Sequence, residues 1–555
     1  MSNLFVRKAT GMVRSWSVLD AFIYAFFSIN LVTLGFYSFS QMYYFGGGMI
    51  PALLISAAFI IFEVVVYASL IAVMPRSGGD YVWQTRIFGG GIGFILSITG
   101  WWFTLWLWTP IYGDMLRQIV ITPLLGAFGL QKAAVWFAGQ GNALFLCSLL
   151  TLGFVALVIF LGMKNYARVQ KYSFYAGMLG LLIVIILLFT GSPDAFKAGL
   201  ASNSAAYFGT QGELYNATAQ AGVDAFASTP LTGGSFGLIM LTLPYLVFFN
   251  LWPNWGATLY GEVRGATDYK RNFAGMAWAL GVTTLLGIVF FLGVARTIGW
   301  DFYVQANAAW WNYAWGYVTE APPLPVWPNP AMLAVFLTDN RLVQIVVLLL
   351  MSTWWFGWAG TLFLSSTRVI FAAAFDRLLP EKAAELNKNG TPVNAMLYMI
   401  LPAIVVAALY AYNVGAGPDG TGGFRSITLA ATQGIAIMYF GTAIAAIILP
   451  YKKKALYEAS PIAQMKVLGI PLITVAGVIF AGFLGFLLVE WMFDPWLNSG
   501  GEGAGLYGIS FKNTNSVIFL LACYGTAAAI YYGFKARRKG EGIDLDKVQA
   551  EIPAE

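Results

Sequence analysis

Polar residues within long apolar stretches are the part of this sequence that could do chemistry. Residues 249–254 read FNLWPN, which places Pro253 between two asparagines in an otherwise apolar run. Proline removes an amide donor and collides with the preceding turn, so a helix must kink or open at this point. Because unpaired asparagines are costly in hydrocarbon, the pattern favours an opened helix that binds a polar solute, with a simple proline kink as the alternative.

A second group of polar side chains lies in the first apolar run, at Ser28, Asn30 and Thr33. Their hydroxyl and amide groups could bond a solute, or the backbone groups that a break leaves free. This run contains no proline, so the residues alone do not require a break there. The side chains that we expect to contact a solute are Ser28, Asn30, Thr33, Phe249, Asn250, Trp252 and Asn254.

Ion binding has two sets of candidates. Glu63 lies in the middle of an apolar run, where an ionisable group is a functional candidate and could carry a proton. A structural carboxyl bonded to a neighbouring helix is the alternative. Hydroxyls at Thr361, Ser365 and Ser366 could supply oxygen ligands for sodium, although hydroxyls in membrane helices more often bond the carbonyl one turn back.

Composition indicates the environment of these residues. The 555-residue chain is 59% hydrophobic and 10% charged, whereas a soluble domain carries about 25% charged residues. Runs of about 20 apolar residues can cross a bilayer as helices. We count twelve, at residues 17–40, 49–74, 92–115, 141–162, 172–191, 234–260, 273–299, 341–374, 393–413, 426–449, 467–490 and 515–534. The sequence therefore predicts an all-α protein that spans a lipid bilayer many times.

The distribution of basic residues predicts the orientation. With the N-terminus in the cytoplasm, all but seven of the 31 lysines and arginines fall on the cytoplasmic side, as the positive-inside rule demands. The seven on the outer side are Arg117, Lys132, Lys197, Arg296, Arg341, Arg425 and Lys512. We expect a multi-pass protein of the plasma membrane with both termini in the cytoplasm, and the net charge of +6 gives no reason to expect nucleic acid as a partner.

Other function classes have little support. Histidine is absent, and Cys147 and Cys523 both lie in apolar runs, so we expect neither a metal site nor a disulfide, and no cofactor. Without a nucleophile motif or a soluble domain, an enzyme is not expected. A channel is disfavoured because no ring of repeated polar residues is visible.

Four fragments at the expected cytoplasmic junctions resemble the amino acid–polyamine–organocation (APC) superfamily of permeases. Residues 365–397 (SSTRVIFAAAFDRLLPEKAAELNKNGTPVNAML) resemble the junction of its eighth and ninth helices. The other three fragments are residues 74–81, 162–169 and 261–272. The resemblance implies two inverted five-helix repeats plus two extra helices. Substrate would lie between opened first and sixth helices, walled by the third, eighth and tenth.

This resemblance divides the chain into segments. They are a cytoplasmic N-terminus (1–16), a first repeat (17–191), a long outer loop (192–233), a second repeat (234–449), two last helices (450–534) and a cytoplasmic tail (535–555). A second long outer loop is expected at about 300–340 within the second repeat. Its tryptophans could belong to an interfacial belt or to a lid over an outer vestibule.

The chain departs from the family where substrate is held. Amino acid transporters of this type usually carry a glycine-rich run in the first helix, where this chain has Leu31, Val32 and Thr33. Some proton-driven relatives place a lysine in the fifth helix, at a position that falls near Gly177 here. The pocket is thus either smaller than usual or made for something other than an ordinary α-amino acid. Proton coupling through a carboxylate, or simple exchange, is favoured over sodium symport.

Charged residues at the cytoplasmic junctions are candidates for a gate. Pairs that exchange partners between closed and open states would separate the two states in energy. The expected pairs are Arg76 with Asp80, Glu262 with Arg264, and Arg368 with Asp376. On the outer side, Asp114 and Arg117 are one turn apart and are expected to form an ion pair.

The sequence thus predicts a secondary transporter for an amino acid or a related organic amine. Its partners would be this small molecule, the bilayer and a proton or, less favoured, a sodium ion; the oligomeric state stays open. The alternative is a membrane sensor or accessory subunit that keeps the fold without transport, which the filled glycine positions would suit.

Overall fold

The structure is a computed structural model that describes residues 16–225, 227–417, 422–493 and 513–551. The expected N-terminal segment is therefore described only at Trp16, and Lys512 lies outside the described residues. Within the described residues, twelve helical spans are long and apolar enough to cross a membrane, which confirms the predicted all-α, twelve-span architecture.

The described residues form 24 α-helices, seven short π or 3₁₀ segments and one two-stranded hairpin, both within the spans and between them. Spans one to five comprise α1 (Val18–Ile29), η1 (Leu31–Gly35), α2 (Phe36–Ser40), α3 (Met49–Val73), α4 (Asp80–Phe88), α5 (Gly90–Ile98), η2 (Thr99–Phe103), α6 (Thr104–Met115), η3 (Leu116–Ile121), α7 (Thr122–Ala127), α8 (Gln131–Ala138), α9 (Asn142–Phe160) and α10 (Met163–Thr190). The next part comprises α11 (Pro193–Phe208), α12 (Tyr215–Asp224), α13 (Phe236–Asn250), η4 (Trp255–Glu262), α14 (Tyr269–Val294), η5 (Ala295–Gly299), α15 (Trp300–Ala314) and α16 (Pro330–Val335). The remainder comprises α17 (Arg341–Ala359), α18 (Thr361–Phe375), η6 (Glu381–Ala384), α19 (Val393–Ala411), η7 (Phe424–Ile427), α20 (Thr428–Lys452), α21 (Lys454–Glu458), β1 (Lys466–Val467), β2 (Ile470–Pro471), α22 (Leu472–Phe493), α23 (Thr514–Gly540) and α24 (Leu545–Ala550).

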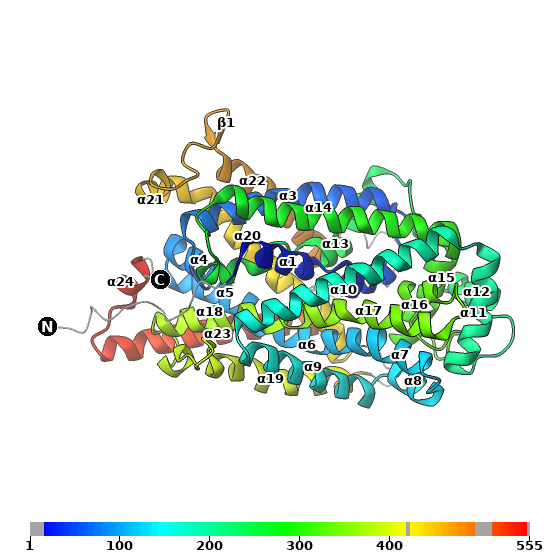
Figure 1. Cartoon of the computed structure of the whole chain (residues 1–555). Helices are drawn as coiled ribbons and strands as arrows, with labels where there is room; N and C mark the ends of the chain where they lie inside the picture. The colour runs from blue at the N-terminus through cyan, green and yellow to red at the C-terminus, as the bar shows by residue number, and fades with distance from the viewer. Residues whose placement is uncertain (1–15, 226, 418–421, 494–512, 552–555) are drawn as a thin grey trace.

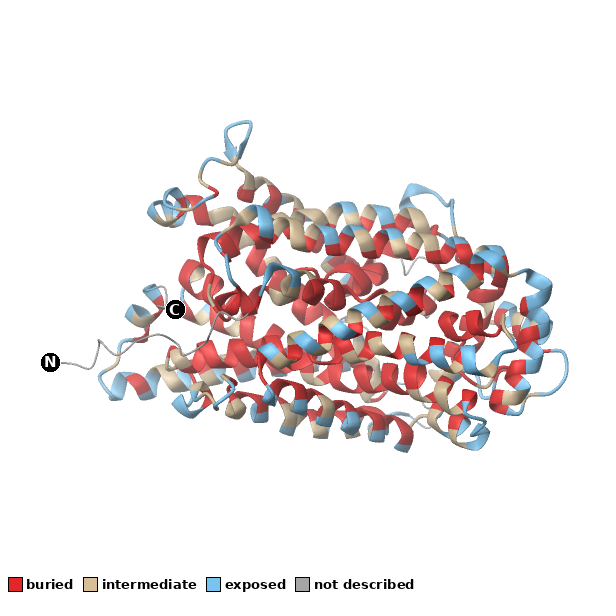
Figure 2. Ribbon diagram, in the orientation of Figure 1, coloured by how far each residue is buried: buried red, intermediate tan, exposed pale blue. Residues whose placement is uncertain are grey.

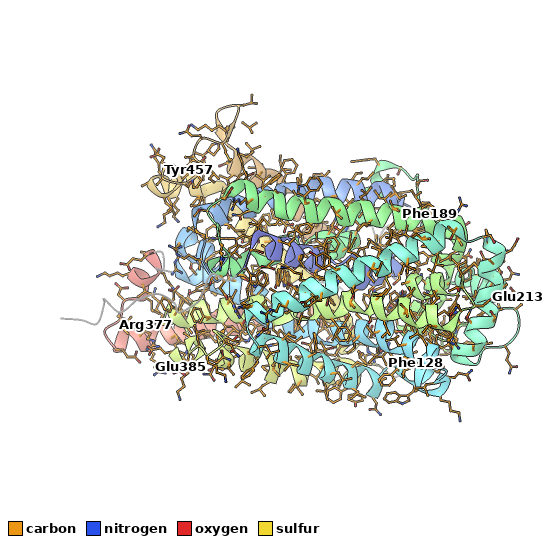
Figure 3. All side chains as sticks on the ribbon, in the orientation of Figure 1. Phe128, Phe189, Glu213, Arg377, Glu385 and Tyr457 are labelled. Atoms are coloured by element: carbon orange, nitrogen blue, oxygen red, sulfur yellow. The ribbon has the colours of Figure 1, made fainter. Side chains whose placement is uncertain are left out.

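The spans run between two faces of the molecule (Figure 1). We call the face that carries α21 and α24 the terminal face, and the face that carries α11, α12 and α16 the distal face. Arg377, Glu385 and Tyr457 lie toward the terminal face, and Glu213 lies at the distal face (Figure 3). Buried residues gather along the middle of the bundle and exposed residues along its outer helices and both faces (Figure 2). This places the polar residues of the opened helices in the protein interior.

Neighbouring spans repeat their pattern at an offset of five. Span one (α1) packs on span seven (α14), and span six (α13) packs on span two (α3). Span five (α10) packs on span eight (α17), and span ten (α20) packs on span three (α6). Because five is odd, equivalent spans cross the bundle in opposite directions, which is the arrangement of two inverted five-helix repeats. Spans eleven (α22) and twelve (α23) pack outside them, on α20 and α5 respectively.

The first span is interrupted at Asn30. Helix α1 ends there with φ 48° and ψ 86°, a left-handed conformation that asparagine tolerates better than most residues. A π-helical turn, η1, follows, and the Gly35 amide donates to the Asn30 carbonyl at 2.8 Å. The Asn30 amide oxygen also accepts from the Thr33 amide at 2.8 Å. The Asn30 side chain therefore stabilises an interruption of the helix that no proline causes.

The sixth span is interrupted around Pro253. Its α-helical part ends at Asn250, and the chain continues as the 3₁₀ helix η4 from Trp255. The Trp252 indole donates to the Phe248 carbonyl at 2.6 Å and satisfies one acceptor of the last turn. Two breaks of different origin thus lie in spans that the repeat makes equivalent.

The segment at 192–233, expected to be a loop, forms α11 and α12 instead. Pro193 occupies the first turn of α11, and the Ser192 hydroxyl accepts from the Ala195 amide, so the helix has a regular start that composition alone did not reveal. The second expected loop is likewise partly helical, because α15 continues span seven and α16 follows it. Its tryptophans Trp310, Trp311 and Trp327 are buried within protein, which argues against an interfacial belt for these three.

Candidate functional site

A narrow cavity lies at the centre of the bundle, with room in this conformation for about one water molecule. It lies where the two interrupted spans meet spans three and eight. The residues that line it are Ser28, Leu34, Trp108, Tyr112, Trp252, Trp255, Trp358 and Thr361. Among these described lining residues none is charged, and five are aromatic. The cavity is therefore an aromatic enclosure with three hydroxyl groups, those of Ser28, Tyr112 and Thr361.

Its aromatic walls are packed against one another. The Tyr112 and Trp358 rings are stacked, with centroids 3.5 Å apart. Trp252 stands at 86° to both Trp108 and Trp255, with centroids 5.5 and 5.2 Å away. The face of an aromatic ring carries partial negative charge, so such walls attract organic cations by cation–π interaction. A positively charged head group is what this enclosure suits best.

Two of the seven residues predicted to contact a solute line the cavity. They are Ser28, whose hydroxyl donates to the Tyr24 carbonyl at 2.7 Å, and Trp252. Asn30 points away, because its amide nitrogen donates to the Trp354 carbonyl of α17 at 3.1 Å. The Thr33 amide donates to the Asn30 side chain within the break, and Thr33 does not line the cavity.

The remaining three predicted residues also face elsewhere. Asn250 accepts a hydrogen bond from the Ser56 hydroxyl of α3 at 2.8 Å. Phe249 packs on Phe39, with ring centroids 4.9 Å apart. Asn254 faces the Tyr439 hydroxyl of α20. Asn250 ends α13 and Asn254 precedes η4, and both contact neighbouring helices, whereas Trp252 and Trp255 line the cavity. The sequence pattern does not reveal this arrangement.

The candidate sodium ligands make other bonds. Thr361 donates to the Trp358 carbonyl at 2.7 Å, and Ser365 donates to the Trp255 carbonyl at 2.8 Å. Ser366 is buried without a hydrogen-bond partner among the described residues. The hydroxyls of Thr361 and Ser365 thus tie span eight to itself and to span six.

The position near Gly177, where relatives place a lysine, is filled by an indole. The Trp354 indole of α17 donates to the Gly177 carbonyl at 2.9 Å, and a Cβ atom at Gly177 would lie only 2.8 Å from the indole nitrogen. Because the Trp354 carbonyl accepts from Asn30, this particular link between spans five, eight and one consists of neutral groups. An indole does not titrate, so this link cannot respond to pH.

Buried ion pairs lie near the terminal face, with partners different from those predicted. Arg368 pairs with Glu262 at 2.8 Å, and Asp376 pairs with Arg86 at 2.6 Å. Arg368 and Asp376 are about two helical turns apart, which is too far for the expected contact. Glu262 faces α18, away from the expected partner in its own loop.

Asp80 does not pair with Arg76 but turns into the bundle at the start of α4. Its carboxylate accepts from the hydroxyls of Tyr67 and Thr442, both at 2.6 Å, and from the Trp101 indole at 2.9 Å. Burial raises the pKa of the Asp80 carboxyl more than these hydrogen bonds lower it. For Arg86, burial lowers the pKa while Asp376 raises it, and the net direction is upward. Arg86 therefore keeps its charge beside Asp376.

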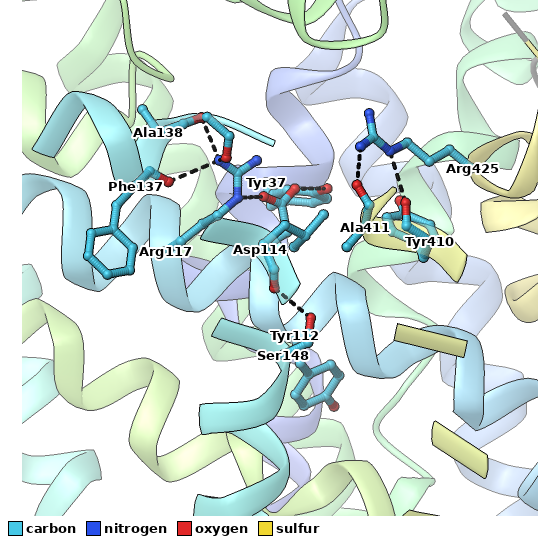
Figure 4. A network of polar contacts seen from close by, with 12 residues as sticks. Tyr37, Tyr112, Asp114, Arg117, Phe137, Ala138, Ser148, Tyr410, Ala411 and Arg425 are labelled. Atoms are coloured by element: carbon cyan, nitrogen blue, oxygen red, sulfur yellow. Dashed lines mark hydrogen bonds and ion pairs between the residues drawn. The ribbon is translucent and has the colours of Figure 1, made fainter. Parts of the chain in front are cut away.

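A second volume of about 390 Å³ lies between the central cavity and the distal face. It shares Leu34 and Trp108 with the cavity, and its wall includes Tyr37 and Trp315. At its edge Tyr37 donates to Asp114 at 2.8 Å, and Asp114 forms the predicted ion pair with Arg117 at 2.6 Å (Figure 4).

Four aromatic wall residues were missed from the sequence: Trp108, Tyr112, Trp255 and Trp358. Trp108 and Tyr112 are spaced i, i+4 on α6, so they share one face of that helix. This spacing was the one available signal, but it also describes ordinary core packing.

Comparisons with known proteins agree with this architecture. A family model described as "Amino acid permease" matches residues 19–503. The chain is 24% identical over 433 residues to an arginine/ornithine antiporter of Pseudomonas aeruginosa, and the match covers 74% of each chain. The family match includes both interrupted spans and every residue that lines the central cavity.

Proposed function

The chain belongs to the amino acid permease family, and from that premise we propose that it is a secondary transporter that moves a cationic amino acid or related organic amine by alternating access. The observation that carries the proposal is the aromatic cavity between the two interrupted spans. Five aromatic side chains enclose it, and the described lining residues include no acid. A cation there would be recognised by ring faces and by the hydroxyls of Ser28 and Thr361.

The similar antiporter supports the same class of solute, since arginine and ornithine both carry a positively charged side chain. Exchange of one cationic solute for another would need no coupling ion, and it is the simpler of the transport modes expected from the sequence. The Leu31–Thr33 run, which replaces the usual glycine-rich run, leaves the positive end of the solute as its principal point of recognition.

Alternation would take place between the two faces. In this conformation the terminal face is closed by the buried pairs Arg368–Glu262 and Arg86–Asp376. The larger volume lies on the distal side of the cavity. Opening the terminal face would require these pairs to separate and hydrate, and closing the distal face would require Trp315 and Tyr37 to approach one another. In a plasma membrane, the positive-inside rule makes the terminal face cytoplasmic.

Reconstitution into liposomes provides the test. Vesicles preloaded with unlabelled arginine should take up labelled arginine, and unlabelled ornithine or putrescine outside should compete with it. Leucine and glutamate should compete weakly, because neither presents a cationic side chain to the aromatic walls. The exposed Trp278→Leu variant is a matched control that should transport normally, since this side chain is 67% exposed on the outside of the bundle.

Two results would count against the proposal. Preference for leucine over every cation would keep a transporter but reject the cationic substrate class. Absence of saturable binding to the whole panel, in protein that unfolds cooperatively, would favour a membrane sensor or accessory subunit without transport.

A further inference from the structure

Glu63 is a buried acid that the transport pathway leaves unexplained. It lies in the middle of α3 and is fully buried, and neither carboxyl oxygen has a hydrogen-bond donor among the described residues. An ionised carboxylate without donors or a counter-charge is highly unfavourable in a water-free interior. In this conformation Glu63 is therefore a neutral acid.

A second carboxyl, that of Asp80, lies near Glu63 and is stabilised by hydrogen bonds from the protein. Asp80 accepts three hydrogen bonds, one of them from Tyr67 at 2.6 Å. Tyr67 follows Glu63 by one helical turn on the same face of α3, and the Asp80 charge acts on Glu63. Two carboxyls that share one dry site cannot both be charged, and the three donors assign the charge to Asp80.

The basic side chains of the elements around this pair have other partners in the described structure: Arg86 of α4 pairs with Asp376, and Arg368 of α18 pairs with Glu262 of η4. From α20 the site faces the Tyr439 hydroxyl, and from the sixth-span break it faces the amide of Asn254. Helix α13 has no charged residue, and the charged residues of α14 are confined to its first turn.

The one charged residue of α22 is Glu490. Phe483 of α22 stacks on Phe59 of α3, and the two helices run in opposite directions. Glu490 is thus displaced from the level of Glu63 by about 16 Å along the bundle.

We propose that Glu63 is a proton-binding site whose occupancy is linked to closure of the terminal face. With that face closed, Glu63 holds the proton beside the charged Asp80. When the face opens and water enters, the carboxyl O–H bond breaks, the proton passes to water and a hydrated carboxylate remains. Lower pH therefore stabilises the closed terminal face, and this stabilisation is lost as the pH rises.

Aromatic contacts connect this site to the central cavity. Trp101, which donates to Asp80, packs on the cavity residue Trp255 with centroids 4.6 Å apart. Tyr439 packs on the cavity residue Trp252 at 6.5 Å and on Tyr67 at 5.5 Å. A solute that shifts these tryptophans would move the groups around both carboxyls, so proton and solute occupancy would be coupled.

Infrared titration of the purified full-length protein tests the site without any substrate, and so does not depend on the proposed function. We expect a carbonyl-stretching band of a protonated carboxylic acid at neutral pH that is absent from Glu63→Gln. The exposed Glu458→Gln variant is the matched control and should keep the band. Glu63→Asp should retain a protonated acid at a shifted frequency, which guards against loss of the band through misfolding.

A conformational titration completes the test. A cysteine introduced at half-buried Ala384 near the terminal face, in a variant that lacks Cys147 and Cys523, should react with a maleimide at a rate that rises with pH. Glu63→Gln in that background should make the rate independent of pH. An unchanged infrared band in Glu63→Gln, or a maleimide rate that keeps its pH dependence in that variant, would overturn the proposal.

Discussion

The two interrupted spans reach a similar geometry by different means. In span six the break is covalent in origin, because Pro253 lacks an amide hydrogen and the 3₁₀ helix η4 follows it. In span one the break depends on one side chain, since Asn30 adopts a left-handed conformation and bonds both Thr33 and Trp354. The comparison teaches that one break is built into the chain while the other is held by tertiary contacts. Their responses to mutation should differ accordingly.

Asn30→Ala should have the largest effect. It removes two buried hydrogen bonds, worth about 1–3 kcal/mol each when a partner is stranded, and puts a Cβ-bearing residue without a polar side chain into a left-handed conformation that costs about 1–2 kcal/mol. We expect the free energy of unfolding in detergent to fall by about 4 kcal/mol. Asn30→Gly loses the same two hydrogen bonds but avoids the backbone strain, so it should be less destabilising than Asn30→Ala. Equal losses in both variants would show that backbone strain contributes nothing.

Trp252→Leu tests what the second break supplies to the cavity. A desolvated cation–π contact is worth about 2 kcal/mol, so the affinity for a cationic solute should fall about 30-fold. Trp252→Phe keeps a ring and should lose less, while the exposed Trp278→Leu should bind normally in the same titration. Affinity that is equal in Trp252→Leu and the wild type would remove this residue from the site.

Asn250→Ala separates packing from solute binding. Its amide accepts from Ser56 and does not line the cavity, so the stability should fall by about 1–2 kcal/mol with little change in solute affinity. A double-mutant cycle with Ser56→Ala should reveal a coupling energy of comparable size. Additive losses would mean that the bond contributes nothing measurable.

Pro253→Ala should have the smallest effect, within about 1 kcal/mol of the wild-type stability. The gain of a possible hydrogen bond opposes the greater conformational freedom of the unfolded chain. Solute affinity should remain close to the wild-type value, because η4 and the Trp252–Phe248 bond are retained. A clear gain in stability with loss of binding would mean that the helix had closed across the break.

Predictability from sequence follows the same division. Twelve apolar runs and a proline between asparagines gave the spans and the second break, because both signals are local. The left-handed turn at Asn30 depends on a carbonyl of Trp354, more than three hundred residues away in the chain. Asn250 is oriented by its contact with Ser56 of α3, and Asn254 by its contact with Tyr439 of α20, and apolar periodicity does not report such contacts between helices.

The sequence predicted that a cavity would lie between the first and sixth spans, but it did not predict most of the residues that line it. Ser28 and Trp252 were found because they lie in the interrupted spans, whereas Tyr112 and Trp358 come from spans three and eight and are joined only by the fold. The ion pairs illustrate the same limit. Residues that were adjacent in the sequence were paired with one another, but buried charges pair across helices, as Arg368 does with Glu262.

The stacked pair of Tyr112 and Trp358 has a consequence for kinetics. At a centroid separation of 3.5 Å the two rings cover one another, and the Tyr112 hydroxyl is also bonded to Thr361 at 2.9 Å. A ligand can stack on Trp358 only after the Tyr112 side chain has rotated away from it. This rotation is a first-order step that precedes association. In stopped-flow measurements the observed rate should level off at high ligand concentration, and Tyr112→Ala should restore a linear dependence on concentration.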